Sequence, residues 1–155
     1  MSRELQTWMG TAFRANTQLV KLLGKNTDGI SAIFPYHHRD EDERIPYPHL
    51  TFARFNNTSE TDPFQGVPEF AISMDNPRMA VCVWSKNSVD ECWKVYRIVD
   101  TMLRGPGVNM SNQYFGAYRC ARTTVRDDLF DEELKLYHLH SEYKVWLQLS
   151  GTPQP

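Results

Sequence analysis

The chain has 155 residues, of which 41% are apolar and 23% charged, and 17 basic against 19 acidic side chains give a net charge of −2. This composition is typical of one globular domain and argues against a basic, sequence-reading nucleic-acid binder. The three cysteines include no Cys-x-x-Cys pair, which disfavours a disulfide scaffold and favours a reducing compartment. Since the sequence starts without a signal-peptide pattern and has no apolar run of about 20 residues, we expect a cytoplasmically made protein without membrane insertion.

Residues 2–24 have apolar side chains at steps of three and four, which predicts helix. Asn16 or Thr17 can cap a new turn, so we expect one helix with a break near Ala15 to Thr17, or two short helices. Gly24 is well placed to end this segment. The apolar positions of its first half are Leu5, Trp8, Met9, Ala12 and Phe13.

A second helix is predicted over residues 89–103. Ser88 followed three residues later by Glu91 reads as a capping box, and Gly105-Pro106-Gly107 stops the helix. The predicted apolar stripe consists of Cys92, Val95, Tyr96, Val99, Met102 and Leu103.

Two-residue alternation and turn residues predict strands over 32–36, 47–55, 69–74, 78–84, 114–126 and 141–149. In the strand 78–84, Val81 and Val83 share one face, and Cys82 and Trp84 share the other. An acidic hairpin tip should precede the closing strand, with Asp131 to Glu133 projecting from the sheet. The core positions expected in that closing strand are Tyr143, Val145, Leu147 and Leu149.

The order helix, strands, helix, strands predicts the α+β class: a single domain over residues 1–150 with an antiparallel or mixed β-sheet and two main helices packed on it. Residues 37–44 and 56–68 are read as long polar loops, and residues 151–155 as a flexible C-terminal tail.

The histidines are the first candidates for metal or acid–base chemistry. His138 and His140 are two residues apart on a predicted strand, so they should face the same way. With His37, His38 or His49 nearby, they would form a metal site. Their spacing matches neither a zinc finger nor a His-Glu-x-x-His helix, and the alternative is that they are polar strand residues. The buried positions expected for Cys82 and Cys92 indicate small hydrophobes rather than nucleophiles.

Aromatic residues make up 12% of the chain. Trp8, Trp93 and Trp146 break or border their local patterns, so they belong either to the core or to surfaces that partners cover.

Several segments, in order, carry a resemblance to a known family. They are the helix end Leu22-Leu23-Gly24, the strand Ile33-Phe34-Pro35, the segment Arg44 to Phe52, the strand Met79 to Ser85, the helix Glu91 to Leu103 and the ending Asp128 to Trp146. Together they resemble the tail-terminator family of long-tailed bacteriophages, also called tail-completion or head–tail joining proteins. The resemblance covers most of residues 5–149, and the loops 37–44, 56–68 and 105–113 depart from it.

The resemblance implies a virion protein at the tail–neck junction, made in the host cytoplasm. It implies a hexameric homo-oligomer whose ring caps the tail tube, stops its polymerisation and contacts the neck or connector protein, without catalysis, metal or cofactor. DNA would pass through the lumen without sequence-specific binding. Acidic loops would repel DNA from the lumen wall. We expect that lining from Asp40, Glu41, Asp42 and Glu43, or from Glu60 and Asp62.

For contacts with a neighbouring subunit or the tube, we expect Asp131, Glu132, Glu133 and Trp146. Two other readings stay open. One is a small metal-binding protein or enzyme that uses His138 and His140. The other is an α+β adaptor in a cellular complex, which would share the fold and differ in its partner.

Overall fold

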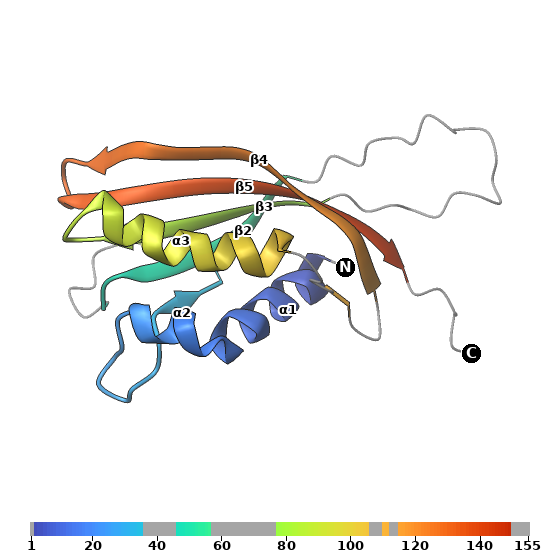
Figure 1. Cartoon of the computed structure of the whole chain (residues 1–155), viewed down its shortest axis with the longest axis horizontal. Helices are drawn as coiled ribbons and strands as arrows, with labels where there is room; N and C mark the ends of the chain where they lie inside the picture. The colour runs from blue at the N-terminus through green and yellow to red at the C-terminus, as the bar shows by residue number, and fades with distance from the viewer. Residues whose placement is uncertain (1, 36–45, 57–76, 106–109, 112–114, 150–155) are drawn as a thin grey trace.

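The computed structural model describes residues 2–35, 46–56, 77–105, 110–111 and 115–149. The helices cover one face of a five-stranded sheet, as Figure 1 shows. This arrangement confirms the predicted α+β class with a mixed sheet. In chain order, the elements are α1 (Ser2–Ala15), α2 (Thr17–Leu22), β1 (Ile33–Phe34), β2 (His49–Asn56), β3 (Arg78–Ser85), α3 (Val89–Arg104), β4 (Phe115–Asp131) and β5 (Leu136–Leu149).

The sheet has the strand order β1-β2-β3-β5-β4, so β3 lies between β2 and β5. Neighbouring strands are antiparallel except for β1 and β2, which are parallel. Val81 of β3 is paired with Phe52 on one side and with Ser141 on the other. Because directly paired residues share a face of the sheet, alternate residues lie either under the helices or on the opposite face, which we call the outer face.

The helices and the sheet enclose one apolar core. From α1 come Leu5, Met9 and Phe13, spaced by four residues, and α3 presents a buried stripe from Cys92 to Leu103. The sheet contributes alternate residues of β2, β3 and β5, namely Leu50, Phe52, Met79, Val81, Val83, Leu139, Tyr143 and Val145. The predicted core positions Tyr143 and Val145 are therefore confirmed, whereas the side chains of Leu147 and Leu149 lie outside the described part.

The N-terminal helical segment is interrupted at Asn16. This residue has an extended backbone, and its Oδ1 accepts a hydrogen bond from the Leu19 N–H at 2.9 Å. Such a bond satisfies an amide that the first turn of a helix leaves unpaired. The predicted break is confirmed, and Asn16 rather than Thr17 is the cap. Within the described residues, no helix has the length and apolar character needed to span a bilayer.

The start of α3 differs in one respect from the predicted capping box. Ser88 caps the helix, since its Oγ accepts a hydrogen bond from the Glu91 N–H at 3.3 Å. The Ser88 N–H, however, donates to Ser85 Oγ at 3.4 Å, and the Glu91 carboxylate accepts a hydrogen bond from the Ser85 hydroxyl. Ser85, the last residue of β3, thus replaces one of the two hydrogen bonds of the capping box and links the strand to the helix. As predicted, the helix stops before Gly105.

The other predicted strands have mixed outcomes. The segments 32–36, 47–55 and 78–84 correspond to β1, β2 and β3, although β1 is shorter than expected. The predicted strand 69–74 and the tail 151–155 lie outside the described residues, as do most of the two polar loops.

Strands β4 and β5 form a long hairpin in which β4 uses 17 residues where β5 uses 14. Three register shifts absorb the difference, between Ala117 and Arg119, Arg122 and Thr124, and Arg126 and Leu129. Each shift is a bulge that breaks the two-residue alternation. For this reason the sequence pattern ended β4 too early, at residue 126. It also began β5 too late, at residue 141, although β5 has no extra residue and pairs with β3 without a register shift.

Asp100 on α3 links the helix to both strands of this hairpin. Its Oδ1 accepts hydrogen bonds from Tyr143 OH at 2.9 Å and from Tyr96 OH at 3.3 Å. Arg104 donates to the carboxylate from two nitrogens, each at 2.8 Å, and Arg122 Nη1 lies 3.5 Å from Oδ2. Burial disfavours the ionised carboxylate, but the hydrogen bonds from Arg104 and Tyr143 and the two guanidinium charges outweigh it. The pKa of Asp100 is therefore lowered.

Gly24 lies where two backbone segments meet, because its N–H donates to Pro48 O at 2.8 Å and its carbonyl accepts from the Ala32 N–H at 2.9 Å. A Cβ on Gly24 would lie 2.8 Å from both N and O of Tyr47. We expect Gly24→Ala to lower the free energy of unfolding, measured by urea denaturation, by about 1–3 kcal/mol. Gly116→Ala is the matched control, since a Cβ there meets nothing within 4 Å. We expect Gly116→Ala to change the free energy of unfolding by less than about 0.5 kcal/mol. Equal losses of stability in the two variants would contradict the close approach of Gly24 to the Tyr47 backbone.

Asp100→Asn keeps the shape of the side chain and removes its charge. At pH 7 we expect the free energy of unfolding to fall by about 1–2 kcal/mol, because hydrogen bonds to a charged group are stronger than neutral ones. Since the folded-state pKa is lowered, the carboxylate stabilises the fold above its unfolded pKa of about 3.9, and this stabilisation is lost as the pH falls through the folded pKa.

Urea denaturation of both proteins across the pH range tests this expectation. The difference in stability should be constant from about pH 7 to pH 5 and shrink below about pH 4. Asp28→Asn, which neutralises an exposed carboxylate, is the control and should change stability by less than about 0.5 kcal/mol. A wild-type advantage over Asp100→Asn that persists unchanged at about pH 2 would rule out the charge as its source.

Candidate functional site

The outer face of the sheet carries a row of rings that crosses four strands. The row consists of Phe34, His49, Trp84 and His138, with successive ring centroids 5.7, 6.0 and 3.9 Å apart. The strand register aligns them, because His49 is paired with Trp84, and Trp84 with His138. Their direct neighbours along β3 and β5, such as Val83 and Leu139, lie in the core. The row therefore follows from strand alternation combined with register.

The stack of Trp84 on His138 is the tightest contact in this row. The two rings are nearly parallel, with an angle of 9° between their planes. Trp84 Nε1 donates a hydrogen bond to Thr51 Oγ1 at 3.2 Å. That bond fixes the indole on β2, and the stack in turn orients the imidazole on β5.

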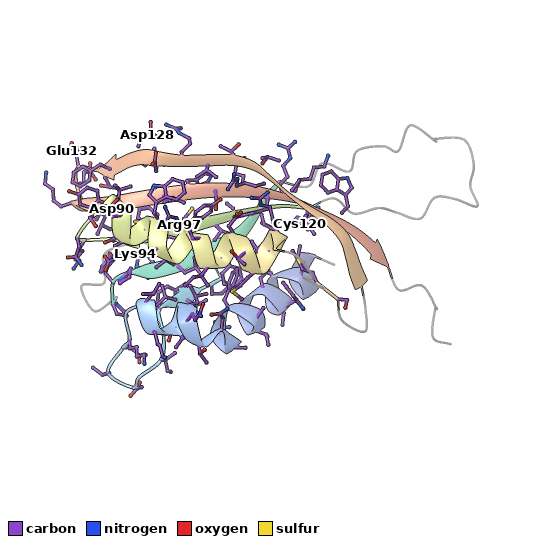
Figure 2. The ribbon with its side chains drawn as sticks, in the orientation of Figure 1. Asp90, Lys94, Arg97, Cys120, Asp128 and Glu132 are labelled. Atoms are coloured by element: carbon purple, nitrogen blue, oxygen red, sulfur yellow. The ribbon has the colours of Figure 1, made fainter. Side chains whose placement is uncertain are left out.

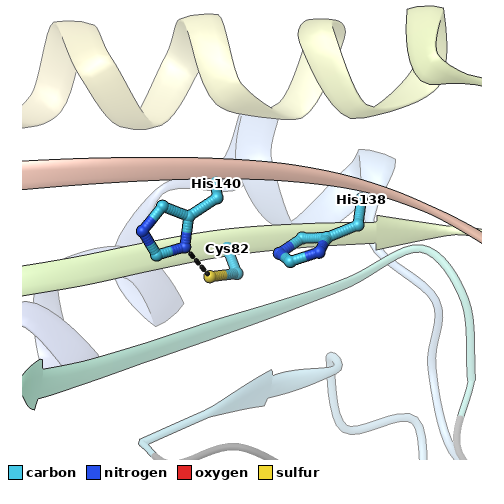
Figure 3. Close-up of side chains that lie close together, drawn as sticks. All are labelled: Cys82, His138 and His140. Atoms are coloured by element: carbon cyan, nitrogen blue, oxygen red, sulfur yellow. Dashed lines mark hydrogen bonds between the residues drawn. The ribbon is translucent and has the colours of Figure 1, made fainter. Parts of the chain in front are cut away.

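Beside this stack, His140 lies between a thiol and a carboxylate. Its Nδ1 is 3.1 Å from Cys82 Sγ, and its Nε2 is 3.0 Å from Glu142 Oε1. Figure 3 shows the imidazole of His140 facing the thiol across the two strands. Burial raises the pKa of Cys82 to about 12, with a hydrogen bond involving Thr51 opposing the rise and the Glu142 charge adding to it. The thiol is therefore protonated at neutral pH and can donate to the imidazole.

Cys82, His138 and His140 together present three ligand atoms within 4.8 Å of one another. The prediction that the two histidines face the same way is confirmed, since their ring centroids are 6.1 Å apart. His49, which was considered for the same site, contacts Trp84 instead, with ring centroids 6.0 Å apart. The other two candidates, His37 and His38, lie outside the described residues.

Cys82 was not among the residues expected at this site, although its face of the strand was predicted correctly. It is 58 residues away from His140 in the chain. The pairing of β3 with β5 brings the two together, and no local pattern in either strand encodes that register.

The predicted acidic hairpin tip is an exposed turn over residues 132–135, while Asp128 to Asp131 still belong to β4. Asp131 Oδ1 accepts hydrogen bonds from the N–H groups of Glu133 at 3.0 Å and Leu134 at 2.9 Å, so this carboxylate holds the turn. Glu132 pairs with Lys135 at 3.3 Å, with the two side chains 80% and 71% exposed. Figure 2 shows Glu132 at the end of the hairpin.

The tip also has apolar surface next to its charges. Phe130 and Leu134 are 42% and 39% exposed, and the ring of Phe130 lies 5.0 Å from that of Tyr137. Such a combination of exposed apolar and charged groups is typical of a contact surface.

Trp146 lies far from the hairpin tip. It is ten residues beyond the start of β5, which corresponds to about 30 Å along a strand. Its half-buried ring lies 5.1 Å from Lys144 Nζ. The structure therefore does not bring together the four residues expected at one interface. The residues expected to line a lumen, Asp40, Glu41, Asp42, Glu43, Glu60 and Asp62, are outside the described residues.

The other two tryptophans that bordered their patterns are partly buried against the core. Trp93 Nε1 also donates a hydrogen bond to Asp127 Oδ2 on β4 at 2.9 Å. Core filling is thus the better account of Trp8 and Trp93. Beside Trp93, the exposed side of α3 forms a polar groove lined by Asp90, Lys94 and Arg97 (Figure 2).

β4 forms one edge of the sheet. Among the described strands it is paired only with β5, and its 17 residues make it the longest of them. An edge of this length offers a row of backbone groups to a further strand.

No protein-family model and no curated protein matches the sequence. Among solved structures, a similar chain belongs to a "Virion of native gene transfer agent (GTA) particle". The two chains are 10% identical and superimpose with a TM-score of 0.63, and the match covers 92% of this chain and 93% of the other. At this identity the similarity shows a common fold, and it extends over nearly the whole of both chains.

Lys135 in the hairpin turn has a left-handed backbone, with φ 54°. Only glycine adopts this conformation without a steric cost. We expect Lys135→Gly to have a higher free energy of unfolding than Lys135→Ala by about 1 kcal/mol, measured by urea denaturation. The two variants lose the same ion pair with Glu132, so their difference isolates the backbone term. If the alanine variant were the more stable, the assigned turn would be wrong.

Proposed function

We propose that the protein is a structural subunit of a phage-like virion, located at the junction of tail and neck. In this role a hexameric ring of subunits caps the tail tube, terminates its polymerisation and joins the tail to the neck or connector protein. The proposal is carried by the fold that the chain shares, over 92% of its length, with a chain of a gene transfer agent virion. The order of motifs that resembles the tail-terminator family supports the more specific ring and tail-capping role.

The shape of the sheet supports assembly into a ring. A ring of identical subunits needs two different complementary surfaces on each subunit, related by a rotation that closes. The edge of β4, which among the described strands is paired only with β5, is a candidate for one of them, because a strand edge can accept a strand or loop of a neighbour. A candidate for the other contacts is the hairpin tip, where Glu132 and Glu133 are exposed.

The distance between the tip and Trp146 divides the proposed interface into two parts. Since the two lie about 30 Å apart along β5, they contact different neighbours or different parts of one neighbour. We assign Glu132, Glu133 and the adjacent apolar side chains of Phe130 and Leu134 to the tail tube or the next subunit. Asp131 acts indirectly, because its carboxylate holds the turn that presents them.

The lumen of such a ring has to let DNA pass without holding it. We propose that the acidic residues between Asp40 and Glu43, or Glu60 and Asp62, line the channel and repel the phosphate backbone. Ring closure would multiply their charge by the number of subunits. A structure of the assembled ring that places both loops away from the channel would end this part of the proposal.

The proposed role needs neither catalysis nor a cofactor, and it places the protein in the host cytoplasm until it joins the virion. An adaptor in a cellular complex would have the same fold. Binding to a tail tube separates the two roles, because a cellular adaptor has no reason to recognise the end of a tube.

Native mass spectrometry and negative-stain electron microscopy test the proposal. We expect a hexameric mass for the protein alone or after addition of tail tubes assembled from the tube protein of the same virion. We further expect density at one end of each tube and no further tube growth after capping. A protein that remains monomeric and leaves both tube ends free would contradict the proposal.

A pair of charge reversals tests the hairpin tip. Glu133→Lys and Asp28→Lys each change an exposed acidic side chain, the first at the tip and the second in the turn after α2. We expect Glu133→Lys to weaken hexamer formation or tube binding about tenfold, as one lost interfacial contact of about 1.4 kcal/mol would, and Asp28→Lys to leave both unchanged. Equal behaviour of the two variants would remove the tip from the interface.

A further inference from the structure

We propose that Cys82, His138 and His140 form a binding site for one transition-metal ion, with zinc as the expected metal. The site lies on the outer face, between β3 and β5, and it is independent of the proposed role in the virion. The observation behind it is that one thiol sulfur and two imidazole nitrogens lie within 4.8 Å of one another.

The donor set and its dimensions fit zinc. Cysteine sulfur and histidine nitrogen are the usual zinc ligands, at about 2.3 and 2.0–2.1 Å, which places neighbouring ligand atoms of a tetrahedral site about 3.3–3.6 Å apart. Cys82 Sγ and His140 Nδ1 are 3.1 Å apart, and the ligand atoms of the group all fall within 4.8 Å of one another. Small side-chain rotations therefore suffice to close the site around an ion.

The three proposed ligands are oriented by neighbouring groups, as ligands in known metal sites are. A histidine that binds a metal through one nitrogen commonly donates the N–H of the other to a carboxylate. His140 has this arrangement, with Nδ1 toward Cys82 and Nε2 3.0 Å from Glu142 Oε1. The side chains of His140 and Glu142 are only 24% and 26% exposed, which protects the pair from competition by water.

The second imidazole and the thiol are held as well. The ring of His138 stacks on Trp84 at 3.9 Å, and Trp84 is itself fixed by its hydrogen bond to Thr51. Cys82 is 1% exposed, and the register that pairs it with His140 fixes its distance from the histidines. Ligands that are already oriented bind an ion with a smaller loss of conformational entropy.

Binding has a defined chemical balance. The Cys82 thiol gives up its proton to solvent, and the resulting thiolate and two neutral imidazoles bind the divalent ion, so one proton is released per ion. Three protein ligands leave a fourth position of the tetrahedron for a water molecule. Because the ligands come from two strands, the ion would act as a clip between β3 and β5 and stabilise the folded chain by mass action.

The test uses the full-length chain without an affinity tag, first treated with a chelator and then titrated with Co²⁺ or Zn²⁺. Cobalt in a tetrahedral site with a thiolate ligand has visible d–d bands and a near-ultraviolet charge-transfer band, which report the cysteine directly. We expect one ion per chain, both sets of bands, displacement of cobalt by zinc, and a higher thermal unfolding midpoint with zinc. A wild-type protein with neither bands nor a shift in midpoint would overturn the proposal.

Matched variants assign the ligands. Cys82→Ala should abolish the charge-transfer band, whereas Cys120→Ala, at a half-buried cysteine outside the group, should keep it. His138→Gln combined with His140→Gln should abolish one-to-one binding, whereas His49→Gln, on the same face, should not. Retention of the charge-transfer band in Cys82→Ala, or its loss in both control variants, would contradict the assignment.

Glu142→Gln tests the role of the surrounding groups without removing a ligand. We expect the same cobalt spectrum with an affinity about 10–100-fold weaker, as when other carboxylates that orient a metal-binding histidine are removed. The thermal unfolding midpoint of each metal-free variant shows whether it folds. If Cys82→Ala does not fold, the histidine variants and Glu142→Gln decide the proposal. Ring assembly of metal-free wild-type protein is measured in parallel, so a failure of one proposal leaves the other intact.

Discussion

The burial of β3 on both of its faces is the constraint on which the rest of the structure depends. The five residues from Met79 to Val83 are all buried, although the helices cover only one face of the sheet. Met79, Val81 and Val83 pack under the helices, and the intervening Ala80 and Cys82 face outward. A slip of one residue would exchange the two sets, placing the Cys82 thiol in the apolar core. The row of side-chain rings on the outer face and the helices on the other face therefore both require the same strand register.

Much of this architecture was predictable from local patterns. The cap at Ser88 and the stop at Gly105 gave the bounds of α3 to within a residue, and Asn16 marked the helix break, because caps act over three or four residues. Strand β4 was less accessible, since its three bulges interrupt the alternation from which strands are recognised. Only part of the group of Cys82, His138 and His140 was predictable. The spacing of the two histidines is a local pattern, whereas their contact with Cys82 arises from the pairing of two strands that are far apart in the chain.

The two faces of the sheet carry different kinds of side chain. On the helix side, apolar packing and the Asp100 network join α3 to β4 and β5, so a change there acts on stability. On the outer face and at the hairpin tip, polar, aromatic and exposed groups are concentrated, and most of the proposed contacts lie there.

The unequal lengths of β4 and β5 have a consequence for the outline of the molecule. The three additional residues of β4 are taken up at its three register shifts, and bulges bend and twist the strand that carries them. Figure 1 shows β4 bending and crossing β5 toward its N-terminal end. A partner strand can lie along that edge only if it has a similar curvature. The β4 edge, the longest among the described strands, is thereby poorly matched to straight strands of unrelated proteins, and its shape limits indiscriminate aggregation.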